Sequence, residues 1–591
     1  MVGRLDDLSL RRVRVGNTRP AGARDLLPQI GALRQGRLGW DDARWAGETA
    51  RYLKDRRARL WPAVRREDAL SQAQDLLLAI DQGTQSVRAM IFDPSGELVA
   101  KSQVHIVPYY SRQPGWAEQD CDYYWTNLRQ ACQNLWWAHP ELRRRVVGMS
   151  VTAQRAVAVC LDEDMTPLRP AIGWLDQRRA NRYPKAPLWL ELGVRAVGQK
   201  KTIHYFQSKA ECNWLAVDEP DLWRRIKHFV FLSGYLNLKL TGRLCDAVGS
   251  QVGYVPFDGK RQQWARPGDF RWRLFAVTRD RLPELVPASG SMGRITAEAA
   301  DETGIPEGLP VYASAADKAC EALAAGAWTP DVAVLSYGTT ATVNTCNERY
   351  VEPIPLLPAY PAAAPGRYNS EIMVQRGYWM VNWFKEQFAA KEMIEAEEKG
   401  VAPEALFERM LEETPVGNMG LILQPFWNPG VRIPGPEAKG AMIGFGDVHN
   451  RSHMYRAIIE GIAYALREAA ARLERRNGVR IRRLKVAGGG SQSDGVMQLT
   501  ADVFGMPAER PHTFEASGLG AAINAAVGAG VYPDHAAAQA QMSRPGRAFT
   551  PIAQNARLYE RLYSDVYARM YPRLAPLYQS IRHITNYPKL N

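Results

Sequence analysis

The chain has 591 residues, 46% of them hydrophobic, so it is a globular protein too long for a single core, and two large domains are expected. It contains no run of eighteen apolar residues, so no membrane-spanning helix is expected. Its seven cysteines form neither a C-x-x-C pair nor a cluster with paired histidines, which argues against a zinc site or a disulfide framework and favours a reducing cytoplasm.

A large part of the net charge of +13 lies at the amino terminus. Residues 1–75 contain fifteen arginines and one lysine against ten acidic residues. The segment lacks an apolar core after its basic start, so it does not resemble a secretory signal, and its acids weaken a transit-peptide interpretation. We expect a solvated, disordered or partly helical appendage. A basic arm that contacts nucleic acid or membrane, and a start codon assigned too early, stay open as alternatives.

The first structured element is a predicted β-hairpin over residues 76–93. An apolar run ends in Asp81, turns through Gly83 and Thr84, and returns as a second strand that carries Arg88. The turn offers backbone N–H groups, hydroxyls and a guanidinium to an anion, while Asp81 can hold a hydrated divalent cation beside it. A nucleotide phosphate needs this combination. An ordinary hairpin, in which Asp81 and Gly83 only make the turn, is the alternative.

Two further glycine elements strengthen the phosphate interpretation. Residues 332–344 again predict strand, Gly-Thr turn and strand, with Gly338 at the turn. Residues 484–495 place Gly488 and Gly489 between a strand and a helix over 496–504, where the backbone allows a close ligand. Because both large units open with such a hairpin, the sequence hints at duplication at the level of fold.

Other elements complete an alternation of strands and helices, which predicts an α/β architecture. Residues 146–152 predict a buried strand, and residues 519–531 a packed helix. The proline-rich segment 353–365 predicts a loop. A helix is expected from Ser452, as its cap, to about Arg476, with Gly478 ending it.

These elements, in this order, resemble the FGGY family of carbohydrate kinases over roughly residues 76 to 560. The segments 113–120, 172–178, 239–242 and 440–461 are similar to further family signatures. The resemblance implies two actin-like, ribonuclease-H-like ATPase lobes with the nucleotide and sugar in the interlobe cleft. It suggests an N-terminal lobe at 76–327, a C-terminal lobe at 330–570 and a tail at 571–591.

The resemblance also implies an ATP-dependent transfer of a phosphoryl group, with ATP and Mg²⁺ as cofactors. Asp317, after a small-residue strand end, matches the family's catalytic base, and Asp81 the metal-side carboxylate. A helix cap is the alternative role for Asp317, and a surface charge the alternative for Arg88. The matching nucleotide-binding residues are Gly83, Thr84, Gln85, Arg88, Gly338, Thr339, Thr340, Gly488, Gly489 and Ser493.

The resemblance implies a small-molecule sugar or polyol as the acceptor, but its identity stays open. Arg155 stands in the loop that contacts the acceptor in glycerol kinases, yet Ala156 replaces their glutamate, and the Met-His pair of xylulokinases is missing too. Trp116, Glu118 and Asp176 are further candidate sugar contacts. Each has a structural alternative: Trp116 in the core, and Asp176 in an internal ion pair with Arg178.

Two other functions stay open beside the kinase. One is a non-catalytic protein that senses sugar and nucleotide on the same fold. The other is a nucleic-acid binder with a basic arm on an actin-type ATPase core, although nucleic acid is the disfavoured partner. No membrane partner is expected. The sequence leaves the oligomeric state open, and a homodimer is one alternative.

Overall fold

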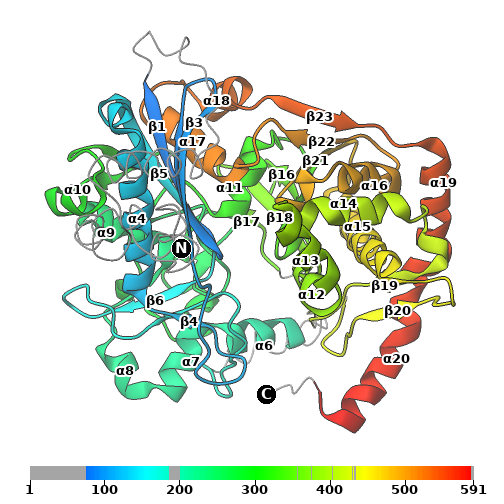
Figure 1. Ribbon diagram of the computed structural model, residues 1–591. Coiled ribbons are helices and arrows are strands. Elements are labelled where there is room, and N and C mark those ends of the chain that lie inside the picture. Colours follow the sequence, from blue (N-terminus) through cyan, green and yellow to red (C-terminus); the bar gives the residue numbers. More distant parts are fainter. Residues whose placement is uncertain are drawn as a thin grey trace, which may run out of the picture.

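The computed structural model describes residues 75–184 and 200–587, apart from positions 356, 375, 402, 429 and 431–433. Two lobes stand side by side, each built on a mixed sheet with helices against it (Figure 1). The predicted α/β class is confirmed. The basic leader predicted at 1–75 lies outside the described residues except for its last one.

The first lobe contains a six-stranded sheet with the order β13-β14-β5-β1-β2-β3. Strand β1 pairs antiparallel with β2 and parallel with β5, which confirms the predicted hairpin and the predicted strand at 146–152. The strands are β1 (Leu76–Gln82), β2 (Ser86–Phe92), β3 (Leu98–His105), β5 (Val146–Ala153), β13 (Ser291–Arg294) and β14 (Pro310–Tyr312).

Both faces of this sheet are covered, so every residue of β1 is buried. Leu76 and Leu78 belong to the hydrophobic cluster that includes helix α4 (Cys121–Ala138). Leu77 and Ala79 belong to the cluster on the other face, which includes helix α17 (Ala516–Gly528). The continuous apolar run of β1 is therefore the expected pattern of a strand buried on both sides.

Helix α17 confirms the helix predicted at 519–531, and it packs against the first lobe although it comes from late in the chain (Figure 1). It lies against helix α11 (Asp317–Ala324), and a Cβ at Gly520 would come within 2.1 Å of the Cys320 carbonyl oxygen. The glycine is required for this close approach. Helix α18 (His535–Met542) joins the same cluster. Residues 516–542, which fall within the second lobe predicted at 330–570, thus cover the first sheet.

The second lobe repeats the plan of the first with a seven-stranded sheet, β17-β18-β16-β15-β21-β22-β23. Its hairpin β15–β16 is antiparallel, and β15 also pairs parallel with β21, as β1 does with β5. The hint of a duplicated fold is thereby confirmed. The strands are β15 (Val332–Tyr337), β16 (Ala341–Asn347), β17 (Tyr360–Pro361), β18 (Tyr368–Val374), β21 (Arg483–Ala487), β22 (Ala508–Pro511) and β23 (Pro545–Phe549).

Helix α15 (Arg451–Asn477) crosses the core of the second lobe. Its cap lies two residues earlier than predicted, because Asn450 rather than Ser452 is the cap. The Asn450 side chain accepts from the Ser452 and His453 amides, and the His453 ring bonds back to the Asn450 amide. The end at Gly478, with φ of 69°, is as predicted. The neighbouring helices are α12 (Trp379–Phe388), α13 (Ala390–Lys399), α14 (Pro403–Glu413), α16 (Asp494–Phe504) and α19 (Ala553–Arg561).

A smaller unit of the first lobe lies below its main sheet in Figure 1 and forms one side of the cleft. Its four-stranded sheet has the order β4-β7-β6-β8. Its elements are β4 (Glu118–Gln119), β6 (Ala158–Leu161), β7 (Ala171–Ile172), β8 (His228–Phe231), α6 (Lys200–Lys209), α7 (Glu211–Asp218) and α8 (Pro220–Arg225). Helix α9 (Leu232–Thr241), which follows β8, packs against the main sheet instead. Short elements connect the rest: β9 (Cys245–Ala247), β10 (Phe257–Asp258), β11 (Gln263–Trp264), β12 (Glu284–Val286), α10 (Ala297–Thr303), β19 (Ile422–Gln424) and β20 (Ala441–Ile443).

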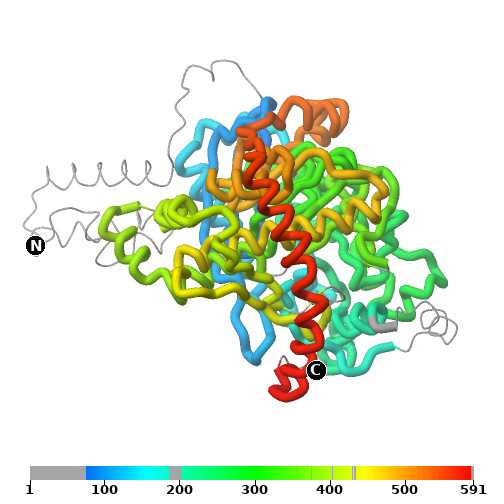
Figure 2. Tube along the Cα trace, turned by 90° about the vertical axis from the view of Figure 1, so that its right-hand side faces the viewer, coloured from blue at the N-terminus to red at the C-terminus, as the bar shows by residue number. Residues whose placement is uncertain are grey.

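The last described helix is α20 (Ala568–Thr585), which runs along the second lobe (Figure 2). The predicted tail from 571 is therefore mostly helical, and Met570 and Tyr578 are buried. All seven cysteines are buried and free. In the described part of the chain, no helix is long and apolar enough to cross a membrane.

Candidate active site

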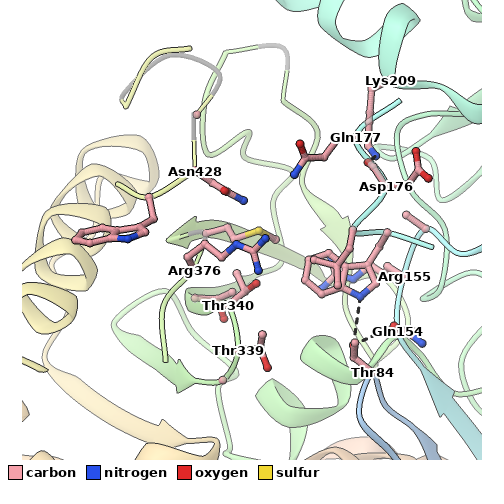
Figure 3. A pocket seen from close by; sticks show the side chains of 18 of the residues that line it. Thr84, Gln154, Arg155, Asp176, Gln177, Lys209, Thr339, Thr340, Arg376 and Asn428 are labelled. Atoms are coloured by element: carbon pink, nitrogen blue, oxygen red, sulfur yellow. Dashed lines mark hydrogen bonds between the residues drawn. The ribbon is translucent and has the colours of Figure 1, made fainter. Parts of the chain in front are cut away.

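A cleft of about 2320 Å³ lies between the lobes, and both hairpin turns line it. Figure 3 shows side chains of the first lobe, such as Thr84 and Arg155, and of the second, such as Thr339 and Thr340, facing the same space. The cleft is lined by every sequence-predicted site residue except Glu118 and Ser493. Residues more than four hundred positions apart therefore meet in one site.

The first turn carries a charged cluster. Arg88 donates from Nη1 to Asp81 Oδ2 at 2.9 Å, and its Nε lies 3.5 Å from Glu515 Oε2. These contacts tie Arg88 to the site and argue against a free surface charge. Thr84 donates its hydroxyl to Gln154 at 3.0 Å and accepts from the Trp174 indole at 3.2 Å (Figure 3).

The carboxylate of Asp81 has two features that suit it to bind a cation. Burial raises the pKa of Asp81 to about 6, against the lowering effect of Arg88, and the charges of Asp317 and Glu515 raise it further. Its Oδ1 is buried and accepts no hydrogen bond from the described residues. A hard cation such as Mg²⁺ suits an unpartnered carboxylate oxygen. No cluster of three or more His, Cys, Asp or Glu in the described ranges could hold a metal ion, so a cation here would complete its shell with water and phosphate oxygens.

The second turn carries hydroxyls and no ionisable side chain of its own. The carbonyl oxygens of Gly338 and Thr339 accept from the Tyr378 and Trp379 amides at 2.9 and 3.3 Å, which fixes the turn against the start of α12. Ser336, on the strand before the turn, accepts a hydrogen bond from Lys318 Nζ at 2.6 Å.

Asp317 is the first residue of α11, and Ala316 holds the cap position. Its half-buried carboxylate accepts the Lys318 amide at 2.7 Å. Its charge raises the pKa values of Asp81 and Lys318, so it lies close to groups at both hairpins. A carboxylate in this position can accept a proton from a ligand bound in the cleft.

The glycine turn after β21 closes another side of the site. Gly488 has φ of 84°, and a Cβ there would approach the Tyr337 carbonyl oxygen to 2.8 Å, so the position requires glycine. Ser493 lies beyond the cleft lining and caps α16, because its hydroxyl accepts the Val496 amide and donates to Glu408.

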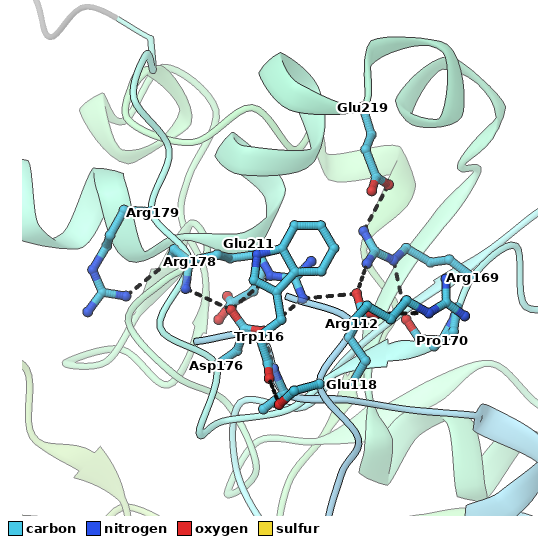
Figure 4. Close-up of polar contacts among 12 residues, drawn as sticks. Arg112, Trp116, Glu118, Arg169, Pro170, Asp176, Arg178, Arg179, Glu211 and Glu219 are labelled. Carbon is cyan, nitrogen blue, oxygen red and sulfur yellow. Dashed lines mark hydrogen bonds and ion pairs between the residues drawn. The ribbon is translucent and has the colours of Figure 1, made fainter. Parts of the chain in front are cut away.

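The first lobe's small unit contains a buried ion-pair network (Figure 4). Glu118 is 1% exposed and pairs with Arg169 and Arg178, which places it behind the cleft wall. Asp176 lines the cleft, but its two oxygens accept four hydrogen bonds, from the Ala117 amide and from three N–H groups of Arg178. The ion-pair alternative for Asp176 and Arg178 is therefore present in the structure.

Trp116 lies over this network and faces the cleft. The Arg178 guanidinium lies 3.8 Å from its ring centroid, and the Trp214 ring meets it edge-on at 5.4 Å. Other aromatic side chains along the same part of the cleft are Trp174, Tyr205, Tyr254 and Tyr360. Aromatic faces of this kind suit the C–H faces of a polyhydroxylated ligand.

Arg155 connects the two lobes. It donates from Nη2 to Glu371 Oε2 on β18 at 2.9 Å, and its guanidinium lies 3.9 Å from the centroid of the Tyr360 ring. Both charged side chains are largely buried, at 11% and 4% exposure. Arg155 is thus already partnered across the cleft, although it still lines it.

Among the cleft residues that the sequence reasoning missed are Gln154, Lys318, Glu371 and Glu515. Gln154 and Lys318 are sequence neighbours of predicted site residues, which is a usable signal. Glu371 and Glu515 lie in no recognisable motif. Only their contacts with Arg155 and Arg88, across 216 and 427 positions, reveal them.

Comparison with known proteins identifies this arrangement. The model of the FGGY family of carbohydrate kinases, N-terminal domain, matches residues 76–324, and its C-terminal domain model matches residues 333–529. The chain belongs to the FGGY family of carbohydrate kinases. As a member, it is an ATP-binding phosphotransferase with an alcohol group as acceptor, and the predicted family and enzyme class are confirmed.

Its relatives match over most of their length. A protein described as an uncharacterized sugar kinase, YgcE, from Escherichia coli (strain K12) is 28% identical over 487 residues, 82% of this chain and 91% of the relative. The xylulose kinase of Lactococcus lactis is 27% identical over 489 residues, 82% and 94% of the two chains. The solved xylulose kinase of Rhodospirillum rubrum has a TM-score of 0.71 at 27% identity, covering 85% of this chain and 100% of that one. The predicted two-lobed actin-like fold is thereby confirmed.

Proposed function

We propose that this FGGY kinase transfers the γ-phosphoryl group of ATP to a hydroxyl group of a sugar or sugar-derived polyol, with Asp317 as the base. The observation that carries the proposal is the position of Asp317, a half-buried cleft carboxylate near Asp81 of the first hairpin and next to Lys318, which bonds to Ser336 of the second. A ligand that reaches both turns passes this carboxylate.

In the proposed step, the acceptor hydroxyl gives its proton to Asp317 as its oxygen forms a bond to Pγ. The bond between Pγ and the β–γ bridging oxygen breaks, and ADP leaves with that electron pair. Phosphoryl transfer of this kind depends mainly on positioning and on charge stabilisation. The base is therefore one part of a site whose other members hold phosphates.

We assign the phosphates to the two turns, Gly83, Thr84, Gln85 and Arg88 on one lobe and Gly338, Thr339 and Thr340 on the other. Asp81 would hold Mg²⁺, which when bound neutralises phosphate charge. Gly488 and Gly489 form the adenosine side. Ser493 supports that turn from behind by capping α16.

The acceptor is assigned to the aromatic end of the cleft, near Trp116 and Arg155. Asp176 shapes this end through its four hydrogen bonds to the loop, and Glu118 supports it from behind. The relatives include proteins named xylulose kinase, glycerol kinase and autoinducer-2 kinase. Ketoses and polyols are accordingly the first acceptors to test.

The test is coupled ADP release with Mg-ATP across ketoses, aldoses, polyols and sugar acids. Asp317→Asn should lower sugar-dependent turnover by about 10²–10⁴-fold, the usual contribution of a positioned base. Asp218→Asn removes another cleft carboxylate and is the matched control, with turnover unchanged. Equal turnover in Asp317→Asn and wild type would contradict the base. A wild type that no acceptor stimulates would instead favour the sensing alternative.

A further inference from the structure

Lys318 is a buried ammonium group at the junction of the two lobes. It follows Asp317 on α11, and its side chain lines the cleft with 22% exposure. Its Nζ donates to Ser336 Oγ at 2.6 Å, so the ammonium lies against the strand that enters the second turn. A Cβ built on Gly338 would stand 3.7 Å from this Nζ. The cation therefore lies directly beside the Gly-Thr turn.

The hydrogen bonds of Lys318 leave room for a ligand. An ammonium group has three donors and no acceptor. One donor reaches Ser336, and Glu321 takes another at 3.2 Å to Oε2, with Oε1 at 3.4 Å. A ligand oxygen in the cleft can take the N–H that makes the longer contact, at 3.4 Å to Glu321 Oε1, while the 3.2 Å contact to Oε2 keeps the ion pair.

The charges around the transfer site explain why this cation matters. Arg88 is held by Asp81 and Glu515, and Arg155 by Glu371. The second turn has no cation of its own. Lys318 supplies one there, next to the carboxylate proposed as base, where negative charge on a transferred phosphoryl group would pass.

We propose that Lys318 binds the γ-phosphoryl group of the nucleotide and holds it between the second turn and Asp317. The inference rests on the proposed function in taking ATP as the phosphoryl donor. It assigns a role to a lysine rather than to the turn alone. Lys318 forms no covalent bond in the step; it stabilises charge on the phosphoryl oxygens by a charge-assisted hydrogen bond.

The first test compares two nucleotides by isothermal titration calorimetry without any sugar. Lys318→Met should weaken binding of the non-hydrolysable analogue AMP-PNP by about 10- to 100-fold, as expected for losing one hydrogen bond to a charged group. Binding of ADP, which lacks the γ-phosphate, should not change. Equal losses for the two nucleotides, or no loss, would overturn the proposal.

A purely structural role for Lys318 predicts a different pattern. If the lysine served only to neutralise buried Glu321, the double variant Lys318→Met/Glu321→Gln would regain AMP-PNP affinity. We expect no recovery in the double variant, and little loss in Glu321→Gln alone; recovery would overturn the proposal. If Lys318→Met does not fold, as judged by its thermal transition, Lys318→Gln gives the same comparison.

Turnover gives an independent readout once an acceptor is known. Lys318→Met should lower kcat by about 10²–10³-fold, comparable to the loss of one transition-state donor, with the KM of the acceptor unchanged. Lys318→Arg should recover part of this, because it keeps the charge without the compact geometry. A wild type that phosphorylates no sugar, yet shows the AMP-PNP difference, would contradict the kinase proposal and leave the assignment of Lys318 standing.

Discussion

The two hairpin turns that line the cleft from opposite lobes share a backbone plan and differ in charge. The first hairpin carries its own ions, Asp81 and Arg88 on paired strands, at a register in which they lie directly opposite each other. The second has only hydroxyls, and the cations beside it come from other segments: Lys318 on α11, and Arg376, which lines the cleft near Thr340 (Figure 3). The duplicated fold thus repeats the phosphate-type turn without repeating its electrostatics.

From this difference we infer a separate role for each turn. The proposed division assigns the metal to the hairpin whose carboxylate has an unpartnered oxygen, and the γ-phosphoryl group to the turn beside the Lys318 ammonium. Variants that affect one turn and leave the other intact can test the division.

The largest effect is expected from Asp81→Asn. The change keeps the side-chain volume but removes the charge that would hold Mg²⁺, so turnover should fall by at least about 10²-fold and the Mg²⁺ concentration needed for half-maximal activity should rise. Ser336→Ala is the matched change beside the second turn, and its Mg²⁺ dependence should equal that of the wild type. An unchanged Mg²⁺ requirement in Asp81→Asn would remove the assignment of the metal to the first turn.

A smaller effect is expected at the contact that joins the lobes. Arg155→Met leaves Glu371 buried without its partner, which typically costs about 3–5 kcal/mol. The thermal midpoint should fall, and the KM of the acceptor should rise because the loop that carries Arg155 loses its anchor. The double variant Arg155→Met/Glu371→Gln should recover much of the midpoint. If its midpoint is no higher than that of Arg155→Met, the ion pair is not what links the lobes.

The lobes also differ in their buried carboxylates away from the cleft. Glu460 in the second lobe pairs with Arg456 at 2.8 Å. Asp246 in the first lobe instead accepts hydrogen bonds from uncharged donors, among them the Gln251 side chain and the Ala247 backbone amide. Burial raises the pKa of Asp246 from 3.8 to about 7, although these hydrogen bonds lower it. The folded state therefore holds the Asp246 proton at a pH at which the unfolded chain releases it.

The pH dependence follows from that pKa. The stabilisation is complete below pH 3.8 and is lost as the pH rises through about 7. Asp246→Asn, which stays neutral, should raise the thermal midpoint relative to wild type at pH 8, and should raise it clearly less at pH 5. Thermal melts of both proteins at the two pH values measure this. The same shift at both would show that the carboxylate does not titrate between them.

The smallest effect is expected at Ser493. Its hydroxyl caps α16, and it lies outside the cleft lining, so Ser493→Ala should cost about 1 kcal/mol of stability and leave the KM of ATP unchanged. Gly488→Ala, in the same glycine segment, should raise that KM, because its Cβ would collide with the Tyr337 carbonyl and displace the turn. A raised KM of ATP in Ser493→Ala would show that the serine contributes to nucleotide binding.

Much of the fold followed from short-range patterns. The hairpins, the strand at 146–152, helix α17 and the end of α15 were all predicted, because apolar alternation, turn glycines and caps act within a few residues. The cap of α15 was misplaced by two residues, since both Asn450 and Ser452 are good cap residues and only the backbone geometry selects between them.

The site was predicted in outline but not in its contacts. The sequence predicted Glu118 and Asp176 as candidate sugar contacts. In the structure both carboxylates pair with Arg178, and Glu118 lies behind the wall of the cleft. No local sequence pattern predicts whether an acidic side chain in a loop points into the cleft or away from it. The orientation depends on the position of the nearest cationic side chain, and packing sets that position.

The sequence by itself determined the family and the two hairpins with their glycine turns, since these rest on residue types at short spacing. The tertiary structure decided which distant residues serve them: α17 returns to cover the first sheet, Glu371 meets Arg155, and Lys318 reaches Ser336. The physical reason is that long-range partners are chosen by the burial of whole faces and by the pairing of buried charges. Both depend on the completed fold.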